Sequence, residues 1–435
     1  MKWSRYNILF NSKRIGYTLF NTRTLSLSTL DEITYKMLNK LKNDTDECIK
    51  EIDEEDLLRL QNNKILTTDD EDDNLVQVLQ YKKQIQSYCT NTLGIIVCPT
   101  LSCNFACPYC YEHNLSKDQM SEQIQDKLIE FINKHKEGMS GLVLNWHGGE
   151  PLAAFETIKQ LYKKIENSSE LGIIHSSMVT NGYLLNEEKC RFLESHHLDY
   201  IQITIDGKKE THDKTRRLKN GGSSYDTIIH NIDIATKLMP NCKIGIRTNI
   251  SKVNKDEYID LYQELSERWK GKNCSVYHAF VLDNNIKSPK QKDKYDFELS
   301  PEEKNIFESE LAEKGIISKD ALYPHFDNGT YTCMDNKAFV ISPKGNIFKC
   351  WADVGIEGRE IGNLEDGITK MTTIAQFMTG SDKFSDNKCR ICSLLPICSG
   401  GCNLCRIGKG CSNNVCDFSE SGLIKKLETY IGDRS

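Results

Sequence analysis

The sequence lacks any long apolar segment. No stretch approaches the roughly 20 consecutive apolar residues of a transmembrane helix. Residues 1–14, MKWSRYNILFNSKR, lack the apolar core of a secretory signal peptide. A large charge excess is also missing, because the formal net charge is −6 over 435 residues, which argues against nucleic acid as the partner. We therefore expect a cytoplasmic protein that binds neither membrane nor nucleic acid.

Cysteine, in contrast, is abundant, with 18 residues in the chain. Without a signal peptide, this number favours metal binding or redox chemistry over a disulfide framework. One group lies at 98–110 and a denser one at 333–416. We expect the scattered cysteines to be small buried hydrophobic residues rather than ligands: Cys48, Cys89, Cys190, Cys242 and Cys274.

The length suggests two to four domains at roughly 100–200 residues each, and residues 1–88 form the first. Two strand-like segments, RYNILF and YTLFNTRTLSLS, are joined by the turn SKRIG. The helix in STLDEITYKMLNKL begins with a Ser/Thr cap, and DEEDLLRLQNNKIL predicts another. TTDDEDDN reads as an acidic, solvated loop before a third helix. This order predicts a winged-helix-like module.

Residues 89–285 alternate between strand and helix patterns. Six such units predict an α/β fold, a partial (β/α)6 barrel whose site lies at the carboxyl ends of the strands. The expected strands are LGIIVCPT, GLVLNWHG, IIHSSMVTNG, LDYIQITIDG, KIGIRTNI and CSVYHAFVLD. Residues 286–330 form a charged connector with one helix. In residues 331–435 long periodic segments are few, so we expect ligation by cysteine to organise this region.

Cys103, Cys107 and Cys110 place three thiols on one loop after the first of these strands, without a fourth ligand. Such a loop can hold three irons of a 4Fe–4S cluster and leave one iron open, whereas zinc sites usually pair two CxxC motifs. The CxxxCxxC spacing resembles the radical S-adenosylmethionine (SAM) superfamily. The resemblance implies that the open iron binds SAM and that the radical is generated there, with Tyr109 beside the adenine. No catalytic side chain is identified.

Gly148, Gly149, Glu150 and Pro151 directly follow the second strand. Two glycines let the backbone approach a ligand, and a carboxylate can hold an ammonium group. Alone this could be a tight turn. One unit after the triad, it resembles the family's GGEP motif for the SAM amino group.

Other residues at strand ends resemble family positions. The resemblance implies that Ser177, Thr180 and Asn181 contact SAM. The series Asp206-Gly207, His212, Asp213 and Arg216 matches a family pattern that either contacts substrate or is a capped loop with an ion pair. Arg247, Thr248 and Asn249 form a further set that could approach SAM.

The later cysteines follow a second pattern, closely similar to the SPASM module. The resemblance implies two auxiliary 4Fe–4S clusters, in addition to the SAM-binding one. A pair of zinc ribbons is the alternative. The implied outer ligands are Cys389, Cys392, Cys398 and Cys416, and the inner ligands are Cys333, Cys350 and Cys402.

This chain departs from fully ligated SPASM modules at the inner cluster. The eighth cysteine, expected shortly before Cys333, is absent from NGTYTC. The inner cluster then either has an open iron suited to a substrate thiolate or recruits Cys274. Cys405 and Cys411 are additional, and either could replace Cys416 or Cys402.

The three modules in this order resemble radical SAM/SPASM peptide maturases. The resemblance implies an N-terminal RiPP recognition element that binds the leader of a precursor peptide, a flavodoxin- or ferredoxin-type electron donor, and an intramolecular thioether or carbon–carbon cross-link. One alternative is an anaerobic sulfatase-maturating enzyme. That subfamily places an Asp base where this chain has Trp351, with Asp353 two residues later. A non-catalytic iron–sulfur carrier or scaffold is the alternative of another class.

Overall fold

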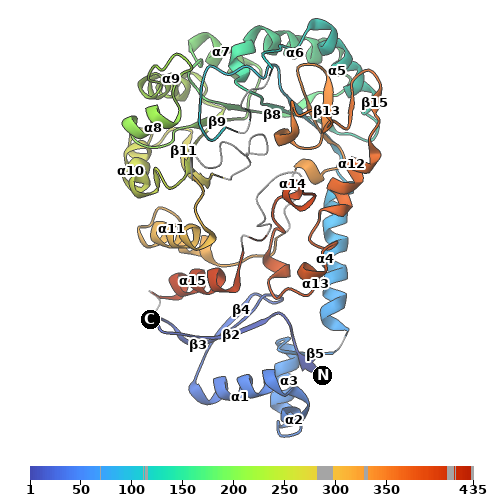
Figure 1. Cartoon of the computed structure of the whole chain (residues 1–435), viewed down its shortest axis with the longest axis vertical. Helices are drawn as coiled ribbons and strands as arrows, with labels where there is room; N and C mark the ends of the chain where they lie inside the picture. Colours follow the sequence, from blue (N-terminus) through green and yellow to red (C-terminus); the bar gives the residue numbers. More distant parts are fainter. Residues whose placement is uncertain are drawn as a thin grey trace.

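The computed structural model describes residues 1–68, 70–110, 112, 116–281, 297–327, 332–408, 416 and 418–432. Its central sheet contains six neighbouring parallel strands, and Figure 1 shows them curving into an open arch. All six coincide with the expected strand segments, which confirms the α/β class and the six-unit partial barrel. In sheet order they are β11 (Cys274–Phe280), β10 (Lys243–Ile250), β9 (Tyr200–Thr204), β8 (Ile173–Thr180), β7 (Gly141–Trp146) and β6 (Thr92–Val97).

Helices cover the outer side of this arch (Figure 1). Alternate strand residues such as Ile201 and Ile203 are fully buried and share one apolar core with Ile228 and Ile232. Residues between them face the concave side, because side chains alternate along a strand. The covering helices are α5 (Glu122–Lys134), α6 (Phe155–Ser168), α7 (Glu187–Ser195), α8 (Lys209–Thr215), α9 (Tyr225–Leu238) and α10 (Tyr258–Arg268).

The sheet extends beyond the predicted barrel. β12 (Ala338–Ile341) pairs in parallel with β6, and β13 (Asn346–Phe348), β14 (Gly362–Asn363) and β15 (Gly367–Ile368) continue it antiparallel. Strand pairing therefore organises residues 338–368, in addition to the expected ligation by cysteine. The apolar run AFVI, four buried residues, finds a hydrogen-bonding edge on β6.

Residues 1–68 form a small α/β unit. β2 (Asn7–Ser12), β3 (Gly16–Asn21) and β4 (Ser26–Leu30) make an antiparallel sheet in that order. α1 (Glu32–Asn43), α2 (Thr45–Ile49) and α3 (Glu54–Asn62) follow, and β1 (Lys2–Trp3) pairs with β5 (Leu66–Thr67). The cap of α1 is Asp31, whose carboxylate accepts from the Thr34 N–H at 2.7 Å, so the expected Ser/Thr cap is wrong.

The N-terminal sheet packs against elements on both of its faces. Leu19 joins Leu38, Leu41 and Leu60 of the following helices. Ile8, Phe10 and Phe20 instead pack with Leu423 and Leu427 of α15 (Glu420–Ile431), close to the other end of the chain.

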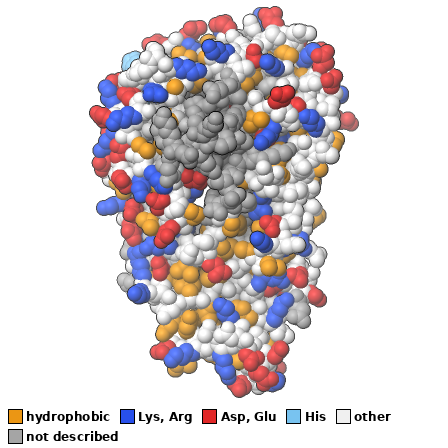
Figure 2. All heavy atoms as spheres, in the orientation of Figure 1, with side chains coloured by type: hydrophobic (Ala, Val, Ile, Leu, Met, Phe, Trp, Pro, Cys, Tyr) orange, Lys and Arg blue, Asp and Glu red, His pale blue; other side chains and the backbone are white. Residues whose placement is uncertain are grey.

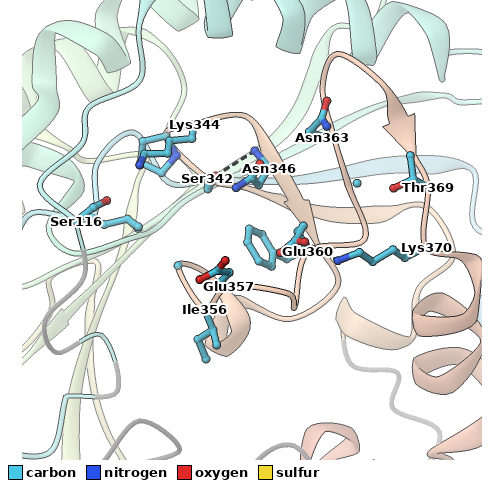
Figure 3. Close-up of a pocket in the computed structure, with 15 residues that line it drawn as sticks. Ser116, Ser342, Lys344, Asn346, Ile356, Glu357, Glu360, Asn363, Thr369 and Lys370 are labelled. Atoms are coloured by element: carbon cyan, nitrogen blue, oxygen red, sulfur yellow. Dashed lines mark hydrogen bonds and ion pairs between the residues drawn. The ribbon is translucent and has the colours of Figure 1, made fainter.

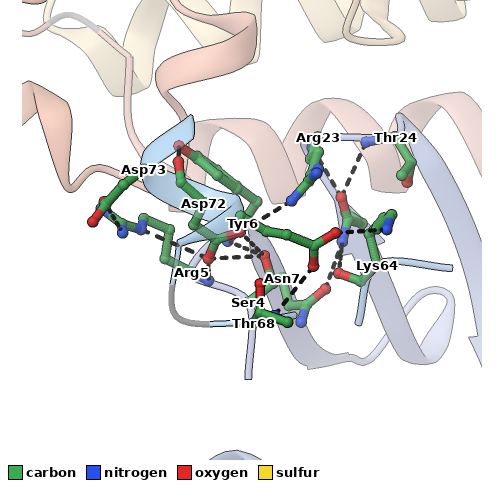
Figure 4. Close-up of polar contacts among 12 residues, drawn as sticks. Ser4, Arg5, Tyr6, Asn7, Arg23, Thr24, Lys64, Thr68, Asp72 and Asp73 are labelled. Carbon is green, nitrogen blue, oxygen red and sulfur yellow. Dashed lines mark hydrogen bonds and ion pairs between the residues drawn. The ribbon is translucent and has the colours of Figure 1, made fainter. Parts of the chain in front are cut away.

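The acidic segment TTDDEDDN is not a solvated loop throughout, because its residues from Glu71 onward form the first turn of α4 (Glu71–Tyr88). The side chain of Asp72 is 0% exposed and accepts hydrogen bonds from the Ser4 hydroxyl (3.0 Å) and the Arg5 N–H (2.9 Å). Guanidinium nitrogens of Arg5 and Arg23 lie 3.7 and 3.4 Å from the carboxylate (Figure 4). Asp72 is held in this way because a carboxylate is favoured in the first turn of a helix and because two arginine side chains reach it.

The remaining described part of the connector contains the expected helix, α11 (Pro301–Glu313), with a capping box between Ser300 and Glu303. Part of the connector, residues 286–296 and 328–330, lies outside the described residues. Among the described helices, none has the length and apolar character that a membrane crossing would need.

Candidate functional site

The cysteine loop of residues 103–110 begins a few residues after β6. The Ala106 N–H donates to the Arg217 carbonyl (2.9 Å), and the Phe105 N–H approaches the Cys103 sulfur at 3.4 Å. Burial, and then the Glu150 carboxylate, raise the pKa of Cys103 to about 11. Burial and nearby Glu112 raise the pKa of Cys110 to about 12. The three thiols lie within electrostatic reach of one another, so an electropositive metal group would be needed to hold them as thiolates.

The two glycines of the GGEP turn pack against the cysteine loop itself. A Cβ on Gly149 would lie 2.5 Å from the carbonyl oxygens of Leu101 and Ser102, and one on Gly148, whose φ is +111°, would lie 2.4 Å from the Thr100 oxygen. We expected these glycines to let the backbone approach a ligand. In the structure they instead let the GGEP turn approach the backbone of residues 100–102. This contact fixes the GGEP turn relative to the triad.

Glu150 is fully buried and binds two of the other predicted residues, Thr180 and Asn181. Its carboxylate accepts from the Leu152 N–H (3.0 Å), the Thr180 hydroxyl (2.6 Å) and the Asn181 N–H (2.7 Å). Burial raises its pKa, while these hydrogen bonds lower it. Asn181 in turn places its amide 3.8 Å from the Cys103 sulfur. Ser177 accepts from the Asn145 amide at 2.7 Å.

Tyr109 joins the cysteine loop to the far wall of the barrel. Its hydroxyl donates to Asp206 and accepts from the Arg216 guanidinium at 2.8 Å, and Arg216 lies 3.5 Å from Asp206. His212 accepts from the Asp206 N–H (3.2 Å), and Asp213 accepts from the N–H groups that begin α9. Within this motif, His212 and Asp213 therefore shape the loop, and Arg216 reaches the cysteines.

The set at the end of β10 divides between the two faces of the sheet. The Asn249 N–H donates to Asp206 at 2.7 Å, and the Arg247 Nε donates to the Asn249 side chain at 2.8 Å. Thr248 is fully buried on the opposite face. Only Arg247 and Asn249 are thus brought toward the site.

The auxiliary cysteines fall into the two expected groups. The inner group is Cys333, Cys350 and Cys402, whose thiols lie within electrostatic reach of one another. In the outer group, burial and then Cys416 and Cys389 raise the pKa of Cys392, and burial and then Cys416 and Cys392 raise the pKa of Cys398. Within the described residues, no three His, Cys, Asp or Glu side chains lie close enough together for a single metal ion. The groups are therefore neighbourhoods of thiols rather than single-ion sites.

The remaining cysteines divide between burial and exposure. Cys48, Cys190 and Cys242 are buried as expected, whereas Cys89 at the end of α4 is exposed, which corrects its assignment to the core. Cys274 begins β11, at the edge of the sheet opposite to the β12–β15 side that carries Cys333 and Cys350, and burial alone raises its pKa; recruitment by the inner group is therefore wrong for this structure. Cys405 is disulfide-bonded, and Cys411 lies outside the described residues.

Trp351 connects the inner group to the GGEP turn, which the sequence did not indicate. It follows Cys350, is 44% exposed, and stacks on His147 with ring centroids 5.9 Å apart and an interplanar angle of 14°. Burial lowers the pKa of His147 to about 4, so its ring is neutral. Asp353 is buried and bound to Arg359 at 2.8 Å.

A cleft of about 470 Å³ is lined in part by Leu101, two residues before the cysteine loop. Leu101 and Phe348 form apolar parts of its wall, and Figure 3 shows Glu357, Glu360 and Lys370 around it. Lys370 pairs with Glu360. The wall of the cleft thus combines apolar groups with paired charges, which suits a polypeptide better than a compact anion.

The residues around the triad fit an anionic metal cluster. Three thiols lie on one loop there, within electrostatic reach of one another. Two buried N–H donors on the same side, Asn104 Nδ2 and Arg216 Nε, have no acceptor within the described part of the chain. A buried donor without an acceptor is costly. An iron–sulfur cluster with bound SAM would supply acceptors and negative charge.

Comparisons with known proteins match the part of the chain that contains the cysteine triad and the GGEP turn. The model of the radical SAM superfamily matches residues 97–265. The Cysteine-type anaerobic sulfatase-maturating enzyme of Clostridium perfringens (strain 13 / Type A) is 25% identical over 356 residues, which cover 73% of this chain and 90% of that enzyme.

Two solved structures share the fold. Native anSMEcpe with bound AdoMet gives a TM-score of 0.59 at 20% identity and covers 78% of this chain and 96% of its own. Streptococcus suis SuiB bound to precursor peptide SuiA gives 0.53 at 16% identity and covers 96% of this chain and 100% of its own. The radical SAM match over residues 97–265, together with the similarity to this maturating enzyme and the shared fold, supports a peptide-modifying enzyme of the radical SAM, SPASM-type maturases.

Proposed function

We propose that this enzyme modifies a ribosomally made precursor peptide, and that it installs an intramolecular thioether or carbon–carbon cross-link. SAM and a 4Fe–4S cluster, when bound, supply a 5′-deoxyadenosyl radical that takes a hydrogen from a peptide carbon. We assign Cys103, Cys107 and Cys110 to the cluster. Thr180 and Asn181 hold the Glu150 carboxylate for SAM, and Tyr109 holds the loop against the barrel wall.

The electrostatics of Glu150 support its assignment to the SAM amino group. The carboxylate is 0% exposed and accepts three hydrogen bonds, but no lysine or arginine forms an ion pair with it within the described residues. A buried carboxylate without a cation is unfavourable. The ammonium group of SAM within hydrogen-bond distance of the carboxylate would offset that penalty.

The observation that carries the proposal is the free edge of β4. In the described residues this strand pairs only with β3, and its side chains are exposed or half-buried. Beside it, Ile33 (82% exposed) and Met37 (41% exposed) lie one turn apart on α1, and Figure 2 shows hydrophobic side chains gathered over this lower part of the molecule. An extended leader could add a strand there and place its apolar side chains on α1. The SuiB match supports this use, since at 96% coverage it includes most of residues 1–88.

The surroundings of Cys350 favour a cross-link over formylglycine. The sulfatase-maturating subfamily uses an Asp base directly after this cysteine, where this chain has Trp351. Asp353 is no substitute, because it is buried and bound to Arg359. Sulfatase maturation remains the second candidate, favoured by the relative from C. perfringens that aligns over 90% of its length.

The decisive experiment supplies the anaerobically reconstituted full chain with SAM, dithionite and one of two peptides. One peptide is a leader with a cysteine-containing core, encoded beside this gene; the other is the cysteine segment of a sulfatase. A cross-link removes two hydrogen atoms and keeps the sulfur, whereas formylglycine loses the sulfur, and high-resolution mass spectrometry separates these products.

A Cys103→Ala variant is the matched control and should release no 5′-deoxyadenosine. Loss of sulfur from the sulfatase peptide, with no change in the leader peptide, would reverse the order of the two candidates. Absence of 5′-deoxyadenosine from the unaltered chain would instead favour an electron carrier or scaffold.

A further inference from the structure

Three cations are buried in the described part of the chain, and each lies beside a different cysteine group. They are Arg216, Lys349 and Lys383, with residue exposures of 9%, 2% and 7%, and no other Lys or Arg among the described residues is classed as buried. Removing a charge from water is costly unless an opposite charge faces it. Their positions therefore indicate where buried negative charge belongs.

Lys349 stands beside the inner group. Its ammonium donates to the backbone oxygens of Asp335 and Ala338, the latter at 2.8 Å, and it forms no ion pair with a carboxylate within the described residues. Backbone carbonyls satisfy its N–H donors but do not neutralise its charge. Cys333, next to Cys350 in this group, lies within electrostatic reach of the ammonium.

Lys383 lies beside the outer group and, unlike Lys349, forms an ion pair with a carboxylate. Its ammonium donates to the backbone oxygens of Leu395 (3.1 Å) and Cys398, and Asp327 is 3.9 Å away. Cys389 and Cys398 lie within its electrostatic reach. Arg406 adds a second cation, since its guanidinium contacts the Cys389 sulfur at 3.1 Å.

Arg216 completes the series at the triad. It lies within electrostatic reach of Cys103 and Cys107, and its guanidinium sits over the Phe105 ring, 5.6 Å from the centroid. Asp206, 3.5 Å away, balances part of its charge, and its Nε lacks an acceptor in the described residues. Each cysteine group therefore has a buried cation that a nearby carboxylate balances in part: Asp206 at Arg216, Asp335 at Lys349 and Asp327 at Lys383.

We propose that Arg216, Lys349 and Lys383 are the counter-charges that set the reduction potentials of the iron–sulfur clusters assigned to the three cysteine groups. The proposal deepens the proposed function, on which it rests for the identity of the metal. The two lysines touch no substrate in this scheme and act through the clusters, so they are positioning residues for electron transfer.

The sign of the effect follows from charge. Reduction adds an electron to a group that is already negative, and a nearby fixed positive charge stabilises the reduced form more than the oxidised form. Neutralising a buried lysine should therefore lower the midpoint potential of its own cluster. An exposed lysine should have little effect, because solvent screens it.

The test uses the full chain with Cys103, Cys107 and Cys110 replaced by Ala, so that only the auxiliary groups remain. Into this background go Lys349→Met, Lys383→Met and, as control, Lys388→Met, which removes an exposed charge one residue before Cys389. Each protein is reconstituted anaerobically with iron and sulfide alone. Iron and sulfide contents are measured, and the reduction is followed by electron paramagnetic resonance during a redox titration.

We expect iron for two clusters in this background and for three in the unaltered chain. Each buried variant should shift one of two signals to lower potential by on the order of tenfold in the reduction equilibrium, which is about 59 mV for a one-electron couple. Lys388→Met should leave both signals unchanged, and Lys349→Arg should restore the potential lost in Lys349→Met.

Unchanged potentials in both methionine variants would overturn the assignment, as would iron for a single cluster in the unaltered chain. If Lys349→Met fails to retain iron, Lys349→Arg decides the matter: recovered iron at the original potential supports the counter-charge, and continued loss refutes it. These readouts need neither SAM nor peptide. A failure to cross-link any peptide would therefore leave them intact and separable from the proposed function.

Discussion

Replacement of Asp72 by Ala should destabilise the N-terminal unit strongly. The carboxylate is 0% exposed, and the change would leave the Ser4 hydroxyl, the Arg5 N–H and two guanidinium groups without their shared acceptor. Removing one partner from a buried ion-pair network costs about 3–5 kcal/mol. Arg5 and Arg23 keep partial access to water, with side-chain exposures of 22% and 17%, so we expect about 3 kcal/mol.

The neighbouring residue offers a matched control. Asp73 is 65% exposed and pairs only with Arg5 among the interactions described, so Asp73→Ala should cost well under about 1 kcal/mol. Native-state hydrogen exchange of residues 2–88 would report both effects, because it resolves local opening that a global melting curve averages. Equal protection in the two variants would refute the claim that the buried carboxylate, rather than general acidity, joins α4 to the sheet.

Three further predictions concern the turn, the barrel wall and the sheet edge. Gly149→Ala should lower the iron bound on anaerobic reconstitution, because its Cβ would meet backbone oxygens at 2.5 Å, whereas Gly172→Ala, which has open space, should not. Burial lowers the pKa of His212 to about 3, below its ordinary 6.5. The unfolded chain then binds the proton more tightly, so stability is lost as pH falls below about 6.5, by about 2 kcal/mol at about pH 5; urea unfolding should show a shallower pH slope for His212→Asn. Proline at Ser28 and proline at Thr29 should differ, since successive N–H groups of a strand point to opposite sides. The variant that keeps its fold should lose leader binding in fluorescence anisotropy, and unchanged binding in both would exclude the β4 edge.

Local patterns predicted the barrel well for a physical reason. Each of its strands is a short apolar run that ends at a turn or cap, because parallel strands buried on both faces read as near-continuous hydrophobic segments. The pairing of residues 338–341 with β6 could not be predicted in this way. AFVI is too short for a period, and its partner strand lies far earlier in the chain, at residues 94–97.

The candidate site was predicted in its residues but not in all of their roles. Spacing identified the cysteines and the GGEP turn, yet it could not show that the glycines face another loop, because that contact exists only after two β/α units pack. The buried lysines had one visible signal, the Lys349-Cys350 dipeptide. Whether the Lys349 amine is buried depends on tertiary packing, which the spacing of residues does not reveal.

The packing of the N-terminal sheet against α15 has a consequence for synthesis. Ile8, Phe10 and Phe20 leave the ribosome long before Leu423 and Leu427, which cover them. Until α15 has been synthesised, this face of the sheet is an uncovered apolar surface that a chaperone could hold. The sheet that we propose to bind a leader is therefore completed only after the cysteine-rich region, so that a variant lacking residues 420–431 would expose one face of that sheet.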